Sequence, residues 1–283
     1  MSRDEILELA EAAVMASKGY YSDKKLMIYE STNENLTELF EQFPVSDKDV
    51  FTVLASSDQP FSCYYHKAKS IDTFDRVHTT LFYYYLRKWI MMYQNRLYPS
   101  YHFFYDGDLP LYCLICDIEP TNQDEADAQF FWKHYLGQNS YKTDKFLFFV
   151  SMCNWPVPFE RDIDSIKGIF DKPISFQHID MFKEFEIKKN YDILVLSNLL
   201  EHTNDEKDLI QARKNIEALL RDDGVAICTQ MRNKKGSSAN EREIDILTSG
   251  SLEFDNTPHQ YYEPLCGGVI DFAYSYKKRK KYN

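Results

Sequence analysis

The segment 49–75 constrains the fold of this chain more than any other part of its sequence. Residues 49–55 (DVFTVLA) are apolar and rich in β-branched side chains, which is typical of a buried strand. The turn-forming residues 56–60 (SSDQP) begin a predicted helix, and a second apolar run, 70–74, ends at Asp75. This order of strand, tight turn, helix, strand and acid predicts a βαβ unit with the proportions of a nucleotide-binding fold.

Strands and helices continue to alternate along the chain. Further strands are predicted at 173–178, 191–196, 225–230 and 269–276, and helical periodicity marks the N-terminus, 34–43, 78–98 and 206–220. Ser2 and Glu5 have the spacing of a capping box, Thr203 is the predicted cap of the helix from 206, and Gly224 is the predicted left-handed residue after it. Apolar strands between helices favour a mostly parallel sheet that helices cover on both faces.

The segment 100–172 lacks the alternation typical of strands. It contains predicted helices at 124–136 and 162–170, so we interpret it as a helical insertion within a single domain, 1–283. The polar segment 233–242 contains Gly and Ser, and we expect a loop there.

Charge and composition exclude several classes of protein. A net charge of −11 disfavours a nucleic-acid partner, because phosphate contacts need clustered Lys and Arg. The basic run 277–281 (KKRKK) is the exception, and we expect a solvated, poorly ordered chain end there. The apolar runs are far shorter than the ~20 residues of a membrane span, and the first residues lack the plan of a secretory signal. The sequence predicts a cytoplasmic protein that does not span a membrane, and it does not indicate the oligomeric state.

The six cysteines have the distribution of reduced core thiols rather than of a disulfide framework. Cys113 and Cys116 form the one paired spacing. A structural zinc site needs a second pair of ligands, and the sequence offers none at suitable spacing. Core packing is the predicted role of this pair, and no metal site is predicted.

Ligands of parallel sheets bind beyond the carboxyl ends of the strands, close to the point where the strand order reverses. The loops after residues 55, 74, 178 and 196 are therefore the predicted positions of functional side chains. The absence of glycine at 55–60 disfavours a nicotinamide dehydrogenase, which needs a Gly-x-Gly-x-x-Gly fingerprint. The Gly-x-Ser-x-Gly elbow of an α/β-hydrolase is also missing.

The order of these loops resembles that of class I S-adenosylmethionine-dependent methyltransferases. The similarity covers 26–98 and 173–231, and includes the acid that ends the βαβ unit and the run YDILVLSNLLEH at 191–202. More narrowly, STNEN at 31–35 and ASSDQ at 55–59 resemble a poorly characterised bacterial group related to the aminocarboxypropyl transferases of betaine-lipid synthesis. The resemblance implies a Rossmann-like α/β fold, a seven-stranded and mostly parallel sheet with an antiparallel edge strand formed by 269–276.

The resemblance also implies S-adenosylmethionine as cofactor and a set of residues that bind it. Asp75 would accept hydrogen bonds from the two ribose hydroxyls, since a carboxylate is an acceptor-only group suited to a vicinal diol. Asp180 would bind the adenine amino group, with Ile179 or Met181 against the ring, and Asp58 would pair with the α-ammonium group. The complete implied set is Thr32, Asn33, Ser56, Ser57, Asp58, Asp75, Asp180, Met181, Ser197 and Asn198. A helix cap or a polar turn is the ordinary structural alternative for these residue types.

The resemblance implies methyl transfer to an acceptor that the sequence does not identify: a small molecule, a lipid or a protein. No catalytic residue is predicted, and Glu201 and His202 are the only acid–base candidates near the fourth strand. Ala55 and Ser57 stand where the family usually has glycine, which lets the backbone approach the ligand closely. This departure keeps a second interpretation open: a methyltransferase-like binding module that has lost or weakened its cofactor binding.

Overall fold

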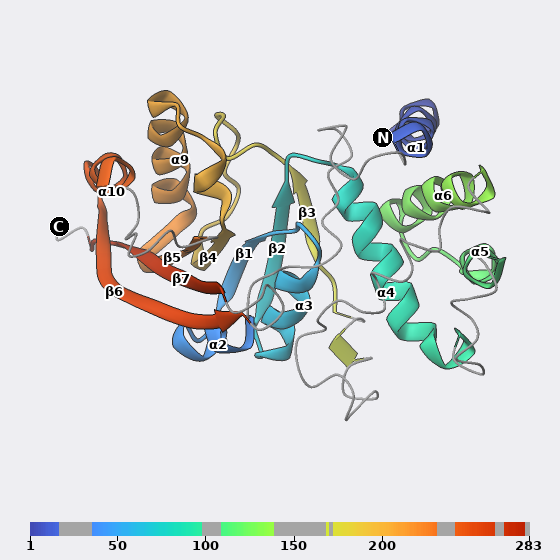
Figure 1. The fold of residues 1–283 in the computed structure, drawn as a ribbon, viewed down its shortest axis with the longest axis horizontal. Helices are drawn as coiled ribbons and strands as arrows, with labels where there is room; N and C mark the ends of the chain where they lie inside the picture. The colour runs from blue at the N-terminus through green and yellow to red at the C-terminus, as the bar shows by residue number, and fades with distance from the viewer. Residues whose placement is uncertain are drawn as a thin grey trace. The chain divides into compact units, whose positions relative to one another are not determined.

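The computed structural model describes residues 1–16, 36–97, 109–138, 168–169, 172–230, 241–263 and 269–280 (Figure 1). Several predictions concern residues outside these ranges: Thr32, Asn33, most of the helix at 162–170 and most of the loop at 233–242. Within the described ranges, no helix is long and apolar enough to cross a membrane.

Seven strands form one sheet in the order β3-β2-β1-β4-β5-β7-β6. Their bounds are β1 Asp49–Val53, β2 Ser70–Asp75, β3 Ser175–His178, β4 Tyr191–Ser197, β5 Leu220–Gln230, β6 Leu252–Glu263 and β7 Val269–Lys278. Neighbouring strands from β3 to β5 are parallel, whereas β7 is antiparallel to both β5 and β6. The predicted fold class is confirmed: a mostly parallel seven-stranded sheet with helices, and antiparallel pairing at one edge.

The strand at that edge differs from the prediction. β7, which contains the predicted strand 269–276, lies between β5 and β6, so it is an inner strand. The outermost strand is β6, and it follows a helix, α10 (Glu241–Thr248). Because β5 and β6 are both antiparallel to β7, β7 alone runs against the other strands of the sheet, as the resemblance implies, and β6 is the strand that the sequence does not predict.

Helices cover both faces of the sheet. The helices α9 (Glu206–Leu219) and α10 lie on one side of the strands, and α2 (Leu36–Gln42) and α3 (Asp58–Tyr65) lie on the other (Figure 1). An aromatic row crosses the central strands, because the Phe51 ring stacks with Phe74 at 4.8 Å and with Tyr191 at 4.9 Å between centroids. Burial on both faces explains why the parallel strands read as continuous apolar runs.

Two helix caps test the sequence patterns. α1 (Arg3–Ala16) begins with the predicted capping box: the Ser2 hydroxyl accepts the Glu5 N–H at 3.2 Å, and the Glu5 carboxylate accepts the Ser2 N–H at 2.7 Å. The predicted cap of α9 is wrong. Asp205 caps that helix by accepting the Lys207 N–H at 2.8 Å, and Thr203 instead supports the cap by accepting the Asp205 N–H.

The predicted role of Gly224 is also wrong. The left-handed residue after α9 is Asp223, with φ of 64°. Gly224 is required for close packing instead, since a Cβ there would lie 2.9 Å from the Arg221 carbonyl oxygen and 3.2 Å from that of Asp192.

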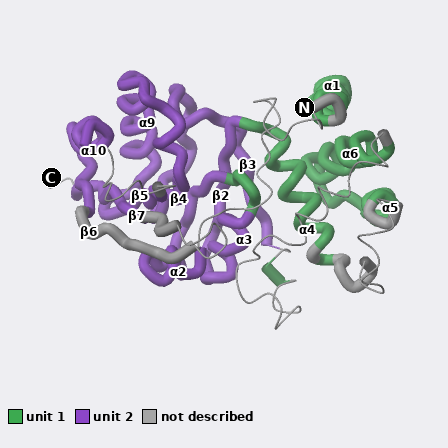
Figure 2. The backbone as a smooth tube through the Cα atoms, in the orientation of Figure 1, with its two compact units in different colours: residues 1–32, 54–57, 77–171 green, residues 33–53, 58–76, 172–283 purple. Residues whose placement is uncertain are grey.

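The chain divides into two compact units (Figure 2). Unit 1 contains residues 1–32, 54–57 and 77–171, and unit 2 contains residues 33–53, 58–76 and 172–283. Unit 2 holds the sheet. Unit 1 holds α1, α4 (Thr79–Leu97), α5 (Leu109–Asp117) and α6 (Gln123–Gln138). The helices predicted at 78–98 and 124–136 are thus confirmed, whereas a single domain with an insertion at 100–172 stays a prediction.

Unit 1 has an aromatic core in which the indole N–H groups of Trp89 and Trp132 are paired. The Trp132 indole donates to the Phe82 carbonyl oxygen at 2.7 Å, and the Trp89 indole donates to the buried Glu125 carboxylate at 2.8 Å. Cys113 and Cys116 do not belong to this core. Both are exposed on α5, so the predicted core packing of this pair is wrong.

The basic run near the C-terminus is bound to the sheet up to residue 280. The Lys278 ammonium group donates to the carbonyl oxygens of Glu217 at 2.7 Å and Leu220 at 2.6 Å. Lys280 pairs with Asp223 at 2.6 Å. The predicted poorly ordered end is therefore wrong for this part of the run, because local carboxylates and carbonyls compensate its charge.

Candidate functional site

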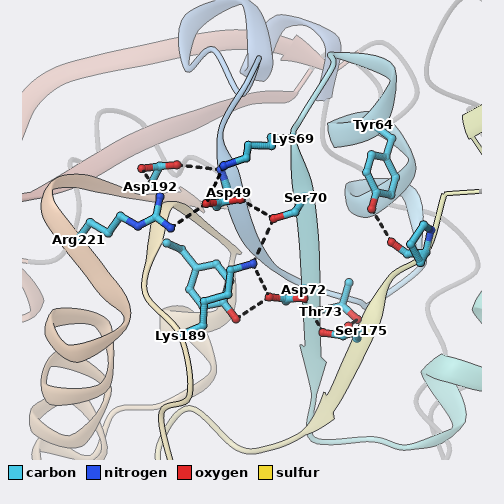
Figure 3. A network of polar contacts seen from close by, with 12 residues as sticks. Asp49, Tyr64, Lys69, Ser70, Asp72, Thr73, Ser175, Lys189, Asp192 and Arg221 are labelled. Carbon is cyan, nitrogen blue, oxygen red and sulfur yellow. Dashed lines mark hydrogen bonds and ion pairs between the residues drawn. The ribbon is translucent and has the colours of Figure 1, made fainter.

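Unit 2 carries a polar cluster at the amino ends of its parallel strands (Figure 3). Asp49, the first residue of β1, accepts hydrogen bonds from Ser70 at 2.6 Å and from Arg221 at 2.7 Å. Arg221 also donates to Asp192 at 3.0 Å, and Asp192 accepts the Asp49 N–H at 2.8 Å. The hydrogen bond from Ser70, helped by the one from Arg221, lowers the pKa of Asp49 to about 2 although burial opposes this.

Asp72 is the second centre of this cluster (Figure 3). Its carboxylate accepts from Ser175 at 2.6 Å, from Tyr191 at 2.9 Å and from Lys189 at 3.0 Å. Asp49 thus connects β1 to β2 and β5, and Asp72 connects β2 to β3 and β4. These contacts lie at the end of the sheet opposite the usual ligand edge. We assign this cluster a structural role.

The carboxyl ends of β2 and β3 lie at the opposite edge. Asp75 is the last residue of β2, only 9% exposed, and is aligned with His178 at the end of β3. The Asp75 carbonyl accepts the Ile179 N–H at 3.1 Å, and a His178 ring nitrogen lies 2.9 Å from the Arg76 carbonyl oxygen. These contacts hold the backbone around the Asp75 carboxylate in a defined position.

The turn after β1 adopts a conformation that side chains normally disfavour. Ala55 has φ of 41° and Ser57 has φ of 75°, both in the left-handed region that glycine adopts most readily. The Ser57 N–H donates to the Leu54 carbonyl at 2.6 Å, which closes the turn. Ser56 and Ser57 are fully buried, and the Ser57 hydroxyl has no hydrogen-bond partner among the described residues.

Arg87 on α4 contacts this turn, and the sequence does not predict that contact. Its guanidinium group, 1% exposed, donates a hydrogen bond to the Ser56 carbonyl oxygen and lies 5.9 Å from the centre of the Tyr83 ring. Both partners belong to unit 1. A basic residue on the buried face of an aromatic helix is the sequence signal that points to such a role.

The other predicted residues near the βαβ unit lie in unit 2. Asp58 is the first residue of α3 and is fully buried. Asp180 follows β3, where one carboxylate oxygen accepts the Phe182 N–H at 3.0 Å and the other lies 3.9 Å from the Lys183 ammonium group. Asp180 thus has the geometry of a polar turn, which is the structural alternative to a role in binding a ligand. Each oxygen of its carboxylate can still accept a further hydrogen bond.

Met181 and Ile179 differ in exposure. The Met181 side chain is buried in the core cluster that also contains Leu196 and Leu200, whereas Ile179 is half-buried at its margin. Ile179 is therefore the better placed of the two to contact a ligand from solvent.

The end of β4 carries the last group of predicted residues. Ser197 ends the strand with φ of 54°, a third left-handed residue at the carboxyl edge, and Asn198 precedes the short 3-10 helix Leu199–His202. Glu201 and His202 are both exposed on that helix. Partial desolvation and the positive charge of Arg76 lower the pKa of His202, which favours its neutral form.

In the part of the chain that the structure describes, no group of three or more His, Cys, Asp or Glu side chains is arranged to hold a metal ion. Asp58, Asp75, Asp180, Ser197 and Asn198 all belong to unit 2, whereas Ser56 and Ser57 belong to unit 1.

No family model and no curated protein matches this sequence. Solved structures that it resembles include N-methyltransferase NodS from Bradyrhizobium japonicum WM9 with S-adenosylhomocysteine, at 10% identity over 97% of this chain and 99% of that chain, with a TM-score of 0.44. The glycopeptide N-methyltransferase MtfA with S-adenosylhomocysteine matches at 10% identity over 95% and 97% of the two chains, with a TM-score of 0.48. The 1,6-didemethyltoxoflavin-N1-methyltransferase of Burkholderia thailandensis matches at 11% identity over 99% and 92%, with a TM-score of 0.44.

Proposed function

We propose that this chain is an S-adenosylmethionine-dependent transferase, with methyl transfer as its reaction. The observation that carries the proposal is Asp75, a nearly buried carboxylate at the carboxyl end of the second strand of a parallel sheet. Strand order reverses at β1, which pairs with β2 on one side and β4 on the other. Ligands of such sheets bind at this reversal, beyond the carboxyl ends of the strands.

The chemistry of Asp75 fits the ribose of an adenosyl group. A carboxylate accepts hydrogen bonds at both oxygens, and a vicinal diol offers two donors side by side.

The turn after β1 supports cofactor binding despite its lack of glycine. Ala55 and Ser57 adopt the left-handed φ values that glycine usually provides. Replacing glycine by these residues therefore leaves the backbone conformation of the turn as expected. Strain of this kind is concentrated at functional sites. The Ser57 hydroxyl is buried and has no hydrogen-bond partner in the described part of the chain, so it is a polar group that a polar ligand would satisfy. Ser56, Ser57 and Asp58 are assigned to the cofactor by their sequence positions, as are Thr32 and Asn33.

The remaining roles follow the loops of unit 2. Asp180 would accept from the adenine amino group through acceptor positions beyond its bond to Phe182, and Ile179 or Met181 would contact the ring. Ser197 and Asn198 would face the acceptor substrate.

S-adenosylmethionine supplies an electrophilic methyl group on a sulfonium centre, so the protein's own task is alignment and exclusion of water. An acceptor that is already nucleophilic needs no general base. Where a proton must leave, His202 is suited to accept it, because its lowered pKa keeps it neutral near pH 7.

Ligand-dependent thermal unfolding tests the proposal. S-adenosylhomocysteine at 100 times its dissociation constant adds about 2.7 kcal/mol to the free energy of unfolding. We expect stabilisation of the wild-type chain by this ligand and by S-adenosylmethionine, no stabilisation by NAD, and loss of the effect in Asp75→Asn. Asp245→Asn, an exposed carboxylate of α10, is the matched control and retains the effect.

The absence of stabilisation of the wild-type chain at millimolar adenosyl ligand refutes the transferase and favours the binding module that lacks the cofactor. Equal stabilisation of Asp75→Asn refutes the role of Asp75. Product analysis then separates the two transfer reactions: methyl transfer leaves S-adenosylhomocysteine, and aminocarboxypropyl transfer, suggested by the narrower resemblance to the betaine-lipid group, leaves methylthioadenosine. Candidate acceptors are small molecules, lipids and proteins.

A further inference from the structure

Two exposed cysteines lie on the same face of α5 in unit 1. Cys113 and Cys116 are both exposed and free, while Leu114 and Ile115 between them are buried. Residues three apart on a helix are neighbours, with about 5–6 Å between their Cβ atoms. The two thiols therefore project to solvent side by side, a juxtaposition that neither the fold nor the proposed transferase function requires.

The backbone that carries this pair is held in place. Gln129 of α6 is buried, and its amide group donates to the carbonyl oxygens of Ile115 at 2.7 Å and Ile118 at 2.6 Å. These two carbonyls flank Cys116 near the end of α5, where a helix leaves its carbonyl oxygens unsatisfied. A fixed last turn presents the two sulfur atoms in a defined geometry, which lowers the entropy cost of binding a ligand to both.

The spacing selects a bridging ligand over a direct disulfide. A disulfide needs Cβ atoms about 3.5–4.5 Å apart, which is closer than the spacing of a regular helix. A soft centre bonded to both sulfurs spans the larger gap, since a metal–thiolate bond adds about 2.3 Å on each side. Soft thiolate ligands select soft metals and metalloids over hard cations.

Charge around the pair favours an electropositive centre. Asp117 ends α5 and Glu119 follows it, and both are exposed. The carboxyl end of a helix carries partial negative charge, which attracts cations.

We propose that Cys113 and Cys116 form a bidentate thiol site for a soft, thiophilic metal or metalloid centre. Binding a monosubstituted trivalent arsenical illustrates the reaction: the arsenoxide exchanges its oxygen for two sulfur bonds, both thiol protons leave with that oxygen as one water, and no group is oxidised or reduced. The site is independent of the proposed transferase function.

Phenylarsine oxide is the probe that tests the site. The folded chain is incubated with one equivalent in the presence of excess glutathione, a monothiol that removes arsenic held by a single protein sulfur. We expect the wild-type chain to retain one phenylarsine group, measured by native mass spectrometry, and to release it to a dithiol. Cys113→Ser and Cys116→Ser each bind at least about 100-fold more weakly, which is the lower end of the gain from a second linked contact.

Two further measurements keep the test decisive. Circular dichroism and thermal unfolding of both serine variants match the wild type, because the exposed positions contribute no core packing. The double variant Cys153→Ser/Cys266→Ser, which removes cysteines outside the described residues, retains the probe. Loss of the probe from the wild type to glutathione overturns the proposal. Equal retention by the Cys113→Ser and Cys116→Ser variants overturns it as well, because it assigns binding to other cysteines.

Discussion

Ala55 and Ser57 hold backbone conformations that glycine adopts at lower free energy. A left-handed conformation costs an L-residue about 1–2 kcal/mol, and a glycine at the same position avoids this cost. Part of the advantage is lost, because the unfolded chain has greater conformational entropy when it contains glycine. The buried hydroxyl of Ser57, which has no partner within the described ranges, adds a further cost to the folded state. We therefore predict that Ser57→Gly raises the free energy of unfolding by about 1 kcal/mol, measured by urea denaturation.

Ser57→Ala is the matched control, because it removes the hydroxyl and keeps the strained φ. A smaller stabilisation of Ser57→Ala than of Ser57→Gly separates backbone strain from the cost of the orphan hydroxyl. A glycine variant less stable than the wild type contradicts the prediction and indicates that the hydroxyl has a stabilising partner.

This turn also shows what a sequence can and cannot reveal about a site. The lack of glycine at 55–60 is visible in the sequence and indicates an altered turn. The structure shows that the left-handed conformations persist, and that Arg87, 31 residues later, donates to the Ser56 carbonyl. Backbone conformation in a turn depends on such distant contacts, which local residue preferences do not encode.

At the scale of elements, the amino-end cluster links the pH dependence of stability to β1. The pKa of Asp49 is lowered to about 2, below its unfolded value of 3.8. A lowered folded pKa contributes stability that is present above the unfolded pKa and is lost as the pH falls through the folded one. We predict that Asp49→Asn costs roughly 2 kcal/mol at pH 7 and that its difference from the wild type disappears between pH 4 and about 2.

Denaturant unfolding at pH 7, 4 and 2.5 measures this effect. Asp47→Asn is the control, because Asp47 is exposed and its carboxylate accepts a long hydrogen bond of 3.4 Å from Ser46. Asparagine also tolerates the left-handed φ of 61° at this position. We expect this variant to follow the wild-type curve. An Asp49→Asn deficit that persists unchanged at pH 2.5 refutes a titration of the carboxylate as its cause.

The elements that the sequence predicts are those with a strong local pattern. β1, β2 and β4 are apolar runs bounded by turn residues, and α4 and α9 show sustained helical periodicity. The segment of α5 is recognisable as apolar, but a short apolar run has no period that distinguishes a helix from a strand. The place of β7 inside the sheet depends on its pairing with β6, and that non-local contact leaves no local signal.

At the scale of the whole molecule, parallel strand order makes the edge of the sheet where a residue lies predictable from the sequence. The carboxyl ends of parallel strands meet at one edge, so the positions of Asp75, Asp180 and Ser197 follow once the strands are recognised. Strand order does not predict which side chains are buried. Met181 lies in the core and Cys113 is exposed, although both are apolar residue types. Side-chain exposure depends on which neighbouring element packs over each face.

Buried tyrosines in both units predict a loss of stability at alkaline pH. Burial raises the pKa of Tyr64 in unit 2 and of Tyr85 in unit 1 to about 12, from the ordinary 10.0. A raised folded pKa gives stability that is complete below the unfolded value and is lost as the pH rises through the folded one. We predict constant stability up to about pH 10 and a loss of roughly 2 kcal/mol per buried tyrosine by pH 12.

Denaturant unfolding across this pH range, followed by circular dichroism, measures the free energy of unfolding. The Tyr64→Phe variant loses less stability than the wild type, because phenylalanine cannot ionise. Exposed Tyr65→Phe is the control with an unchanged pH profile. Unfolding free energies that stay level to pH 12 contradict the prediction, since they require equal proton binding by the tyrosines in both states.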